Sequence, residues 1–389
     1  MRKIGCIFLS LFLLLTAMPM AVSATEPEAG GKSALLMDAA TGTVLYEKNA
    51  HEKLPPASVT KVMTMLLILE ALDSGRIGWQ DSVTTSEAAA AKGGSQIYLK
   101  VGESMTVTDL VKSIAVSSAN DAACAMAEYI AGSEAAFVDK MNEKAAELGM
   151  NDTHFVNCTG LDDDPDAANH VTCAYDIALM SRELMVHHPK IKEFTTIWMD
   201  TVRDGAFGLA NTNKMVRFYP GCTGLKTGFT QKAGYCLSAT AVRDGMELIA
   251  VVMGAATSQE RFNTCKQLLD YGFANYALAT PELENKYEIP VKLGISGTVR
   301  AVPAEDVTLL IDKAQKGSVT TEVTLEASVT APVSQGQRLG TLTVKAGDRV
   351  LRQVNMVASE AVRKLTWWQI FTGLLRRLTM RGGSCQLVR

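Results

Sequence analysis

The sequence has few of the residues that metal-dependent peptidases and disulfide-rich domains need. Its five histidines form no HExxH pair, so no zinc-peptidase ligand set is visible and no metal site is predicted. One of its eight cysteines, Cys6, lies in the amino-terminal leader. The other seven are odd in number and widely spaced, which argues against a disulfide framework or a zinc cluster and favours single buried thiols. They are Cys124, Cys158, Cys173, Cys222, Cys236, Cys265 and Cys385.

The chain also has little net charge. A value of −3 over 389 residues gives no electrostatic case for nucleic-acid binding. Apolar residues make up 47% of the chain and charged residues 20%, which is ordinary for a globular protein with a sizeable core. At this length two domains are expected rather than one.

The first 24 residues have the pattern of a targeting signal. Arg2 and Lys3 form a charged start, an apolar run covers 7–20, and small residues precede a cleavage site after Ala24. The alternative is an uncleaved membrane anchor, but the apolar run is short for a membrane span. On either interpretation, the chain after Ala24 is expected outside the cytoplasmic membrane, secreted and attached to its outer face.

Residues 25–280 are predicted to form an α/β (α+β) catalytic domain whose sheet takes strands from both ends and has a helical insert between them. A strand pair is expected at 33–50 and a hairpin at 234–255, around the turn Arg243-Asp244-Gly245. Helices are expected at 62–72, 106–116, 121–132, 134–148, 172–188 and 259–277. Ser133 and Thr172 are the predicted caps of two of these helices. The helix at 62–72 is apolar on every face and is therefore expected to be buried.

Two further segments follow. Residues 281–359 are rich in Val and Thr, alternate with period two and break at glycines, which predicts a small all-β domain. The tail, 360–389, contains a 360–383 segment with apolar residues at helical spacing and only positive charges after Glu360. This composition predicts an amphipathic helix lying in the plane of a membrane surface. The alternative is a helix docked on the β domain.

The stretch "PPASVTKVMTM" (55–65) places Lys61 one helical turn after Ser58. Side chains at i and i+3 are neighbours, so the hydroxyl can reach the amine. A serine becomes a useful nucleophile when a base takes its proton, and lysine can be that base when burial lowers its pKa. The S-x-x-K spacing alone arises by chance about once in such a chain. Taken alone, it favours a helix-capping serine beside a surface lysine.

Two more patterns strengthen the catalytic interpretation. Ser118-Ala119-Asn120 lies in a polar break between apolar helices, and Lys226-Thr227-Gly228 lies just ahead of the hairpin. The set S-x-x-K, S-x-N and K-T-G, in that order, is the signature of penicillin-binding proteins and class A β-lactamases.

The sequence resembles the serine-type D-alanyl-D-alanine carboxypeptidases, which are low-molecular-mass penicillin-binding proteins. The likeness covers roughly 33–277 and includes "ASVTKVMT", "VSSANDAA", "THFVNCTGL", "NTNKM", "GLKTGFT" and "AGYCLSATA". The β domain and the amphipathic tail also resemble the family's layout. The resemblance implies a β-lactamase/transpeptidase-like core, a substrate of peptidoglycan stem peptides ending in D-Ala-D-Ala, inhibition by β-lactams, and no cofactor.

The resemblance also implies residue roles. Ser58 resembles the nucleophile that forms the acyl-enzyme, Lys61 its base, and Ser118 the residue that passes the proton to the leaving D-alanine. Asn120 would hold the substrate amide, and Lys226 would add positive charge near Ser118.

The remaining implied roles belong to the K-T-G strand and the last helix. Thr227 would bind the terminal carboxylate, and Gly228 would let the substrate lie against the strand edge without a Cβ in the way. The backbone N–H groups of Ser58 and Phe229 would form the oxyanion hole. Arg261 resembles an arginine near the carboxylate end, and its alternative is a surface arginine.

Two departures bear on the alternatives. Ala119 stands where class A β-lactamases carry Asp, which favours the peptidase, and Phe229 follows K-T-G where some relatives have histidine. A β-lactamase of the same fold would need a deacylating glutamate, and no E-x-x-L-N stretch lies between Ser118 and Lys226; the run 162–166 is a solvated acidic loop instead. A non-catalytic peptidoglycan-binding protein is the other alternative, and the three intact motifs count against it.

Overall fold

The computed structural model describes residues 26–163, 165–281, 283 and 287–380. The chain divides into two compact units, one ending at Ala277 and the other beginning at Leu278. The predicted leader, 1–24, lies outside the described residues, as does Cys385. None of the described helices is both long enough and apolar enough to span a membrane.

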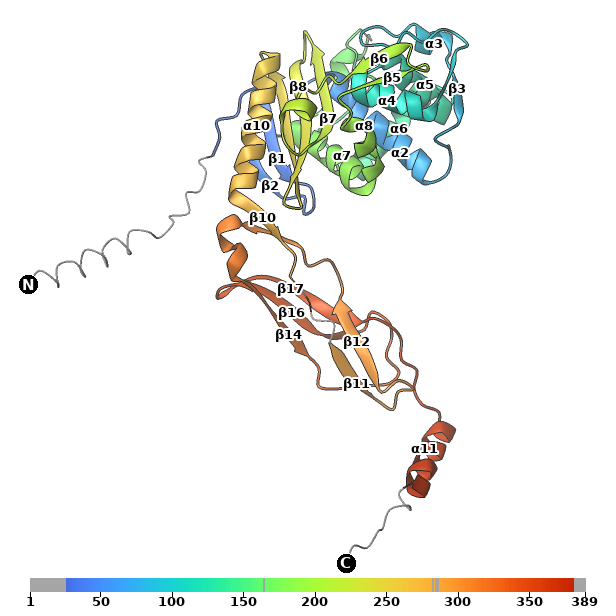
Figure 1. The fold of residues 1–389 in the computed structure, drawn as a ribbon, viewed down its shortest axis with the longest axis vertical. Coiled ribbons are helices and arrows are strands. Elements are labelled where there is room, and N and C mark those ends of the chain that lie inside the picture. Colours follow the sequence, from blue (N-terminus) through green and yellow to red (C-terminus); the bar gives the residue numbers. More distant parts are fainter. Residues whose placement is uncertain (1–25, 164, 282, 284–286, 381–389) are drawn as a thin grey trace, which may run out of the picture. The chain divides into compact units, whose positions relative to one another are not determined.

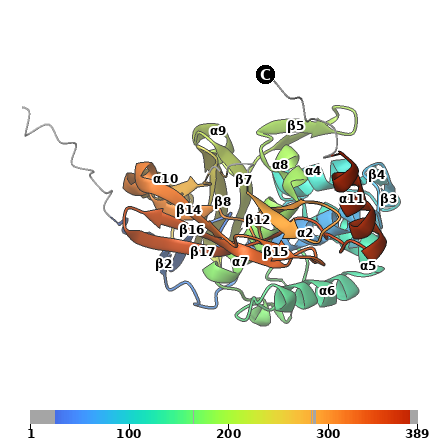
Figure 2. The same cartoon turned by 90° about the horizontal axis from the view of Figure 1, so that it is seen from below.

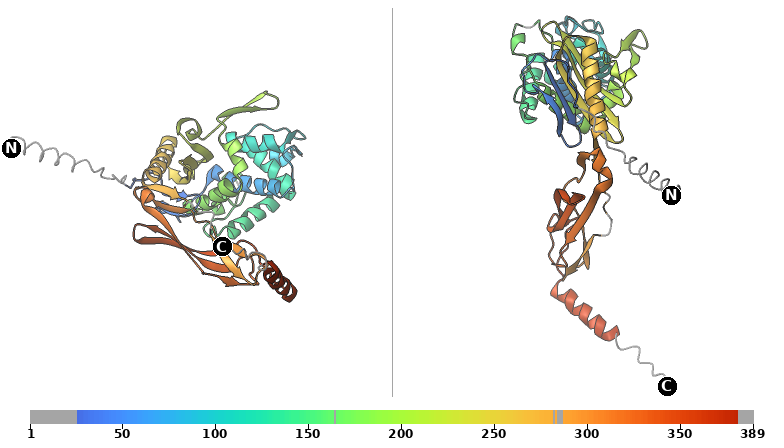
Figure 3. Two further views of the ribbon diagram at one scale, coloured as in Figure 1. Left: turned by 60° about the horizontal axis from the view of Figure 1, so that its bottom comes forward. Right: turned by 90° about the vertical axis from the view of Figure 1, so that its left-hand side faces the viewer.

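The first unit is built on an antiparallel five-stranded sheet in the order β2-β1-β9-β8-β7. Its strands are β1 (Ser33–Asp38), β2 (Val44–Lys48), β7 (Cys222–Thr230), β8 (Gly234–Arg243) and β9 (Met246–Ala255). The strand pair and the hairpin are therefore confirmed. The helix α10 (Ser258–Asn275) covers one face and α7 (Ala174–His187) packs on the other, against β1 and β9 (Figures 1 and 3).

A group of helices fills the space beyond α7, as the sequence predicts. It consists of α2 (Lys61–Asp73), α4 (Val107–Ser117), α5 (Asn120–Ala131) and α6 (Glu134–Glu147). The helix α2 packs against α4, α5, α6 and α7, and nearly all its residues are buried. A helix that is apolar on every face is stable only in such a central position, because exposing any of its faces to solvent would be unfavourable.

The helix caps confirm one prediction and correct another. Ser133 caps α6, and its hydroxyl accepts from the Ala136 N–H at 3.2 Å. The predicted cap of α7, Thr172, is wrong. The Sγ of Cys173 accepts from the Asp176 N–H instead, at 3.4 Å, while Thr172 exchanges two backbone hydrogen bonds with Leu54.

Short elements connect these parts of the first unit. They are the 3-10 helices η1 (Ala57–Thr60), η2 (Ala167–Asn169) and η3 (Pro189–Ile191), the short helices α3 (Glu87–Ala90), α8 (Lys192–Thr195) and α9 (Met215–Phe218), and the strand pairs β3 (Ser82–Thr84) with β4 (Ser104–Thr106) and β5 (Met199–Val202) with β6 (Phe207–Ala210).

The second unit is the predicted all-β domain (Figure 2). Its six-stranded sheet has the order β14-β16-β17-β12-β11-β15, and β10 pairs with β13. Along β11 and β12, exposed and buried residues alternate, as the period-two pattern requires. The strands are β10 (Tyr276–Ala279), β11 (Glu288–Lys292), β12 (Thr298–Pro303), β13 (Leu309–Asp312), β14 (Val319–Leu325), β15 (Val329–Thr330), β16 (Arg338–Ala346) and β17 (Arg349–Ala358), with the 3-10 helix η4 (Lys313–Ser318).

The tail helix begins later than predicted. The helix α11 covers Trp367–Met380, and the first residues of the expected 360–383 segment belong to the β domain instead. Val362 is 3% exposed in that domain's core and bonds to Val333 through backbone groups, and the Leu365 N–H donates to the Leu293 carbonyl. Backbone groups that are used in strand pairing cannot also form helical hydrogen bonds. The helix therefore starts only after Thr366, whose hydroxyl accepts from the Gln369 N–H.

Candidate active site

Ser58 and Lys61 lie at the junction of η1 and α2. The Lys61 amine donates to the Ser58 hydroxyl, with Nζ and Oγ 3.0 Å apart. The alternative of a capping serine beside a surface lysine is wrong on both counts. The cap position of η1 is Pro56, and Lys61 is completely buried. The sequence spacing thus produces a partly exposed serine in hydrogen-bond contact with a lysine that is shielded from solvent.

The electrostatics of Lys61 follow from this burial. Loss of hydration lowers the pKa of the Lys61 amine to about 7, and the nearby Cys158 and Asp121 oppose this shift more weakly. The amine also donates to the backbone carbonyl of Thr159, at 2.8 Å. A lysine held between two acceptors and neutral near pH 7 can accept the proton of Ser58.

The loop 157–161 holds that carbonyl in place. The side-chain oxygen of Asn157 accepts from the N–H groups of Thr159 and Gly160, and its amide nitrogen donates to the Leu161 carbonyl. Gly160 has φ of +81°, and a Cβ on it would lie 1.9 Å from the Ala57 carbonyl oxygen. The loop therefore packs against the segment that carries Ser58 in a way that only glycine permits.

Ser118 and Asn120 lie at the corner between α4 and α5. Ser118 is 4% exposed and has φ of +65°, the left-handed conformation that ends α4. The Asn120 amide nitrogen donates to the Gly93 carbonyl at 2.7 Å, while its Oδ1 is buried with no hydrogen-bond partner among the described residues. Since a buried acceptor without a donor is costly, this oxygen is suited to accept an N–H from a bound ligand.

The K-T-G residues lie on β7, the edge strand of the sheet. Lys226 is buried and its amine donates to the Thr227 carbonyl, while the Thr227 hydroxyl donates to Thr212. A Cβ on Gly228 would lie 2.7 Å from the Pro56 carbonyl oxygen and 3.1 Å from the Ser58 nitrogen. Glycine is thus needed here for the close approach of β7 to the Ser58 segment. The room that it would leave for a substrate stays a prediction.

The surroundings of Lys226 disfavour its positive charge. Burial lowers its pKa well below the ordinary value, and the positive charges of Lys61 and Arg261 act in the same direction. Lys226 therefore feels two like charges, and no carboxylate offsets their effect on its pKa. An anionic ligand would act in the opposite direction and favour the charged form of Lys226.

Arg261 and Phe229 both contact Tyr235 in this strand region, with the Arg261 guanidinium 5.2 Å from the Tyr235 ring centroid. Arg261 is 7% exposed, so the surface alternative is wrong, and its guanidinium donates to the carbonyls of Gly228 and Cys236. Phe229 is half exposed and packs on Tyr235, with ring centroids 4.3 Å apart. Arg261 therefore holds the backbone of β7 and β8 through these two carbonyls, while Phe229 leaves about half of its ring exposed to solvent.

Several residues that shape the site were not predicted individually. Thr159 contributes only a backbone carbonyl, which leaves no trace in side-chain patterns. Thr212 donates its N–H to the Val116 carbonyl and accepts from Thr227, so it links the end of α4 to β7. Asn213 donates to the Gly224 carbonyl. Their only signal in the sequence is membership of the stretches "THFVNCTGL" and "NTNKM".

The groups gathered around Ser58 define the chemistry that the site can perform. They are hydroxyls, amines, an amide and backbone N–H groups, which together suit acyl transfer to a serine. Among the described residues of this site, no set of imidazole, thiolate and carboxylate groups converges on Ser58 to hold a metal.

Comparisons with known proteins agree with this chemistry. The sequence profile of the peptidase S11 family, described as D-alanyl-D-alanine carboxypeptidase, matches residues 20–257, and that of the penicillin-binding protein 5 C-terminal domain matches 283–364. D-alanyl-D-alanine carboxypeptidase DacF of Bacillus subtilis is 44% identical over 339 residues, which cover 86% of each chain. The crystal structure of penicillin-binding protein 5 from Haemophilus influenzae superposes with a TM-score of 0.74 at 30% identity, covering 88% of this chain and all of that one. Penicillin-binding protein D2 from Listeria monocytogenes, solved in its ampicillin-bound form, is 34% identical with a TM-score of 0.58, covering 64% of this chain and all of that one.

Proposed function

Because this chain belongs to the peptidase S11 family of D-alanyl-D-alanine carboxypeptidases, we propose that it removes the terminal D-alanine from peptidoglycan stem peptides through an acyl-enzyme on Ser58. The observation that carries this proposal is the buried Lys61 amine, 3.0 Å from the Ser58 hydroxyl and with a pKa of about 7. The chain is a hydrolase. The β-lactamase and the non-catalytic alternatives are not favoured, because its relatives are carboxypeptidases.

In the acylation step, the neutral Lys61 amine takes the proton of Ser58 while Oγ attacks the carbonyl carbon between the two D-alanines. The C–N bond then breaks, and the departing amine receives its proton through Ser118. The peptide carbonyl oxygen, which gains negative charge, is stabilised by the N–H groups of Ser58 and Phe229. Such a donor is worth about 3–4 kcal/mol where it has been measured.

Substrate binding uses the polar side chains of Asn120, Thr227 and Lys226. The Oδ1 of Asn120 accepts an N–H of the stem peptide, which supplies the donor that this buried oxygen lacks. The terminal carboxylate binds Thr227 and the positive charge of Lys226. In the final step water attacks the Ser58 ester, and the trimmed stem leaves. β-Lactams acylate the same serine, and they are the inhibitors that this chemistry predicts.

The function and the role of Lys61 are tested together by the pH dependence of D-alanine release from a peptide ending in D-Ala-D-Ala. Only the neutral amine is a base, and its pKa is about 7. We expect kcat/KM to rise about tenfold per pH unit below pH 7 and to level off above it. The Ser58→Ala variant should release no D-alanine at any pH. A flat profile for the wild type would contradict the assignment of Lys61, and activity in Ser58→Ala would contradict the proposed function.

The tail helix supports a second part of the proposal, that the protein is exported and attached to the outer face of the cytoplasmic membrane. The apolar side chains of Trp367, Trp368, Phe371, Leu374 and Leu375 are 44–72% exposed in the structure. In the sequence they are accompanied by positive charges only, among them Arg363 and Lys364. Exposed apolar side chains on a helix, with cationic residues just before it and within its sequence, suit the surface of a membrane with anionic lipids.

Deletion of 367–389 tests this attachment. Because Val362 belongs to the β-domain core, the deletion starts after Thr366 and leaves that core intact. We expect the full-length protein to sediment with vesicles that contain phosphatidylglycerol and the deleted protein to stay in the supernatant. High salt should weaken binding by the full-length protein. Equal binding by both proteins would show that another part of the chain is the anchor.

A further inference from the structure

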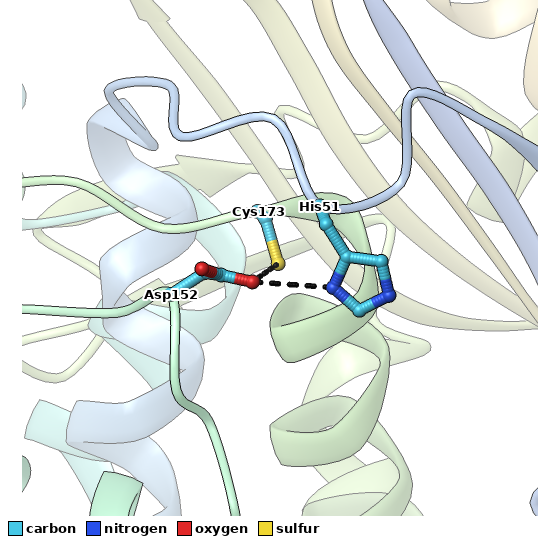
Figure 4. Close-up of side chains that lie close together, drawn as sticks. All are labelled: His51, Asp152 and Cys173. Atoms are coloured by element: carbon cyan, nitrogen blue, oxygen red, sulfur yellow. Dashed lines mark hydrogen bonds and ion pairs between the residues drawn. The ribbon is translucent and has the colours of Figure 1, made fainter.

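Three side chains with metal-binding atoms come together in the first unit, apart from the residues assigned to catalysis, and range from an exposed His51 to a buried Cys173 (Figure 4). His51 follows β2, Asp152 follows α6, and Cys173 precedes α7. The Asp152 Oδ2 lies 3.2 Å from the His51 Nδ1 and 3.9 Å from the Cys173 Sγ. All three donor atoms lie within 4.8 Å of one another. Their separation in the sequence hides this cluster from motif analysis.

The spacing and the chemistry of these atoms fit one class of ligand. In a tetrahedral site, with zinc bonds of about 2.0–2.3 Å, neighbouring ligand atoms lie roughly 3.3–3.8 Å apart. Imidazole nitrogen, carboxylate oxygen and cysteine sulfur are the three ligand types that zinc prefers. We propose that His51, Asp152 and Cys173 bind one zinc ion, with water as the fourth ligand, and that the ion has a structural role. The half-exposed imidazole leaves one side of the cluster open to that water.

The groups around the three ligands hold them in place. The Asp176 N–H donates to the Cys173 Sγ at 3.4 Å, and the Asp176 carboxylate accepts the Asp152 N–H at 2.9 Å. Cys173 also caps the 14-residue helix α7, whose positive end favours a thiolate. The His51 ring packs against Tyr175, with centroids 4.9 Å apart. Partners of this kind orient ligands before a metal arrives.

Two features oppose zinc binding and reduce its affinity. Lys53 lies 3.5 Å from the other Asp152 oxygen, Oδ1, so it shares the carboxylate without occupying Oδ2. Burial raises the pKa of the Cys173 thiol to about 12, so the thiol is protonated at neutral pH. The metal must displace that proton, and binding releases it to solvent.

The position of the cluster explains what a bound ion would do. The backbone of Leu54 exchanges two hydrogen bonds with Thr172, and the Tyr175 N–H donates to the Ala50 carbonyl. His154 in turn exchanges two backbone hydrogen bonds with Val171, so all three ligand segments are joined through their backbones. An ion shared by all three would strengthen this junction and stabilise the folded chain by mass action.

The proposal is tested by zinc binding to metal-free, full-length protein, followed by calorimetry and by melting temperature. We expect one ion per chain with micromolar or tighter affinity and a higher melting temperature with zinc. Cys173→Ser, which keeps a good helix cap, and His51→Gln should each weaken binding by about 100-fold. Cys222→Ser, which changes a thiol outside the cluster, should bind as the wild type does.

Cobalt(II) gives a readout that depends on the sulfur itself. Cobalt bound to the wild type should show a thiolate-to-metal charge-transfer band in the near ultraviolet, and Cys173→Ser should lack this band. Absence of zinc binding at micromolar concentrations, or binding that neither variant weakens, would overturn the proposal. Neither readout uses peptide hydrolysis, so the zinc site and the proposed function can fail separately.

Discussion

Replacement of Lys61 by methionine should lower the rate of Ser58 acylation by about 10⁴-fold while the protein remains folded. The base contributes on that order because, without it, the Ser58 hydroxyl keeps its proton. Methionine has a similar length and no charge, so it fills the same buried space without the cost of desolvating an amine. The lost donor leaves the Thr159 carbonyl unpaired, which costs about 1–3 kcal/mol.

The measurement is the second-order rate constant for acylation by a chromogenic β-lactam, alongside the melting temperature. Lys61→Arg should be equally slow, because an arginine side chain stays protonated and cannot act as a base. Lys140→Met, on the partly exposed face of α6, is the matched control and should acylate at the wild-type rate. Rapid acylation of Lys61→Met would show that another group takes the serine proton.

Substitution of Gly160 by alanine should destabilise the first unit and slow acylation together. The added Cβ would lie 1.9 Å from the Ala57 carbonyl oxygen, a backbone atom that cannot rotate away. The left-handed φ adds a further penalty of about 1–2 kcal/mol for a residue with a Cβ. We expect a total loss of about 3 kcal/mol or more, and the Thr159 carbonyl should move away from Lys61.

Gly149 provides a matched control for this prediction. It has φ of +72°, close to that of Gly160, but a Cβ there would meet no atom within 4 Å. Gly149→Ala should therefore show only the conformational penalty and keep the wild-type acylation rate. Thermal melts and acylation kinetics of both variants separate the two costs. Equal losses of stability in the two variants would mean that the contact between Gly160 and Ala57 is not tight.

The buried position of Lys61 could be predicted because the residues that follow it are almost all apolar. The segment after Lys61 is apolar on every face, and such a helix has to be central. The i, i+3 spacing then brings Ser58 to the amine. The Thr159 carbonyl could not be predicted in the same way. Every residue has the same backbone carbonyl, so only the three-dimensional path of the loop determines which carbonyl accepts the Lys61 hydrogen bond.

The errors in the prediction also have physical causes. Val362 fits both a helical repeat and an inward-facing strand position, and the pairing with Val333 decides between them. A threonine hydroxyl is a better hydrogen-bond acceptor than a thiol, yet the Cys173 Sγ and not Thr172 caps α7. Arg261 is polar, and its burial is possible only because two strand carbonyls accept its hydrogen bonds. For Val362 and Arg261, partners far away in the sequence determine the outcome.

The central claim, that Ser58 is an acylated nucleophile, is tested most directly by intact-protein mass spectrometry after exposure to benzylpenicillin. The Ser58→Ala variant is the control, and it should fold normally because the change removes only one hydroxyl. The account predicts one covalent penicillin adduct per wild-type chain and none on Ser58→Ala. An equal adduct on both proteins, or intact penicillin and no adduct on the wild type, would contradict it.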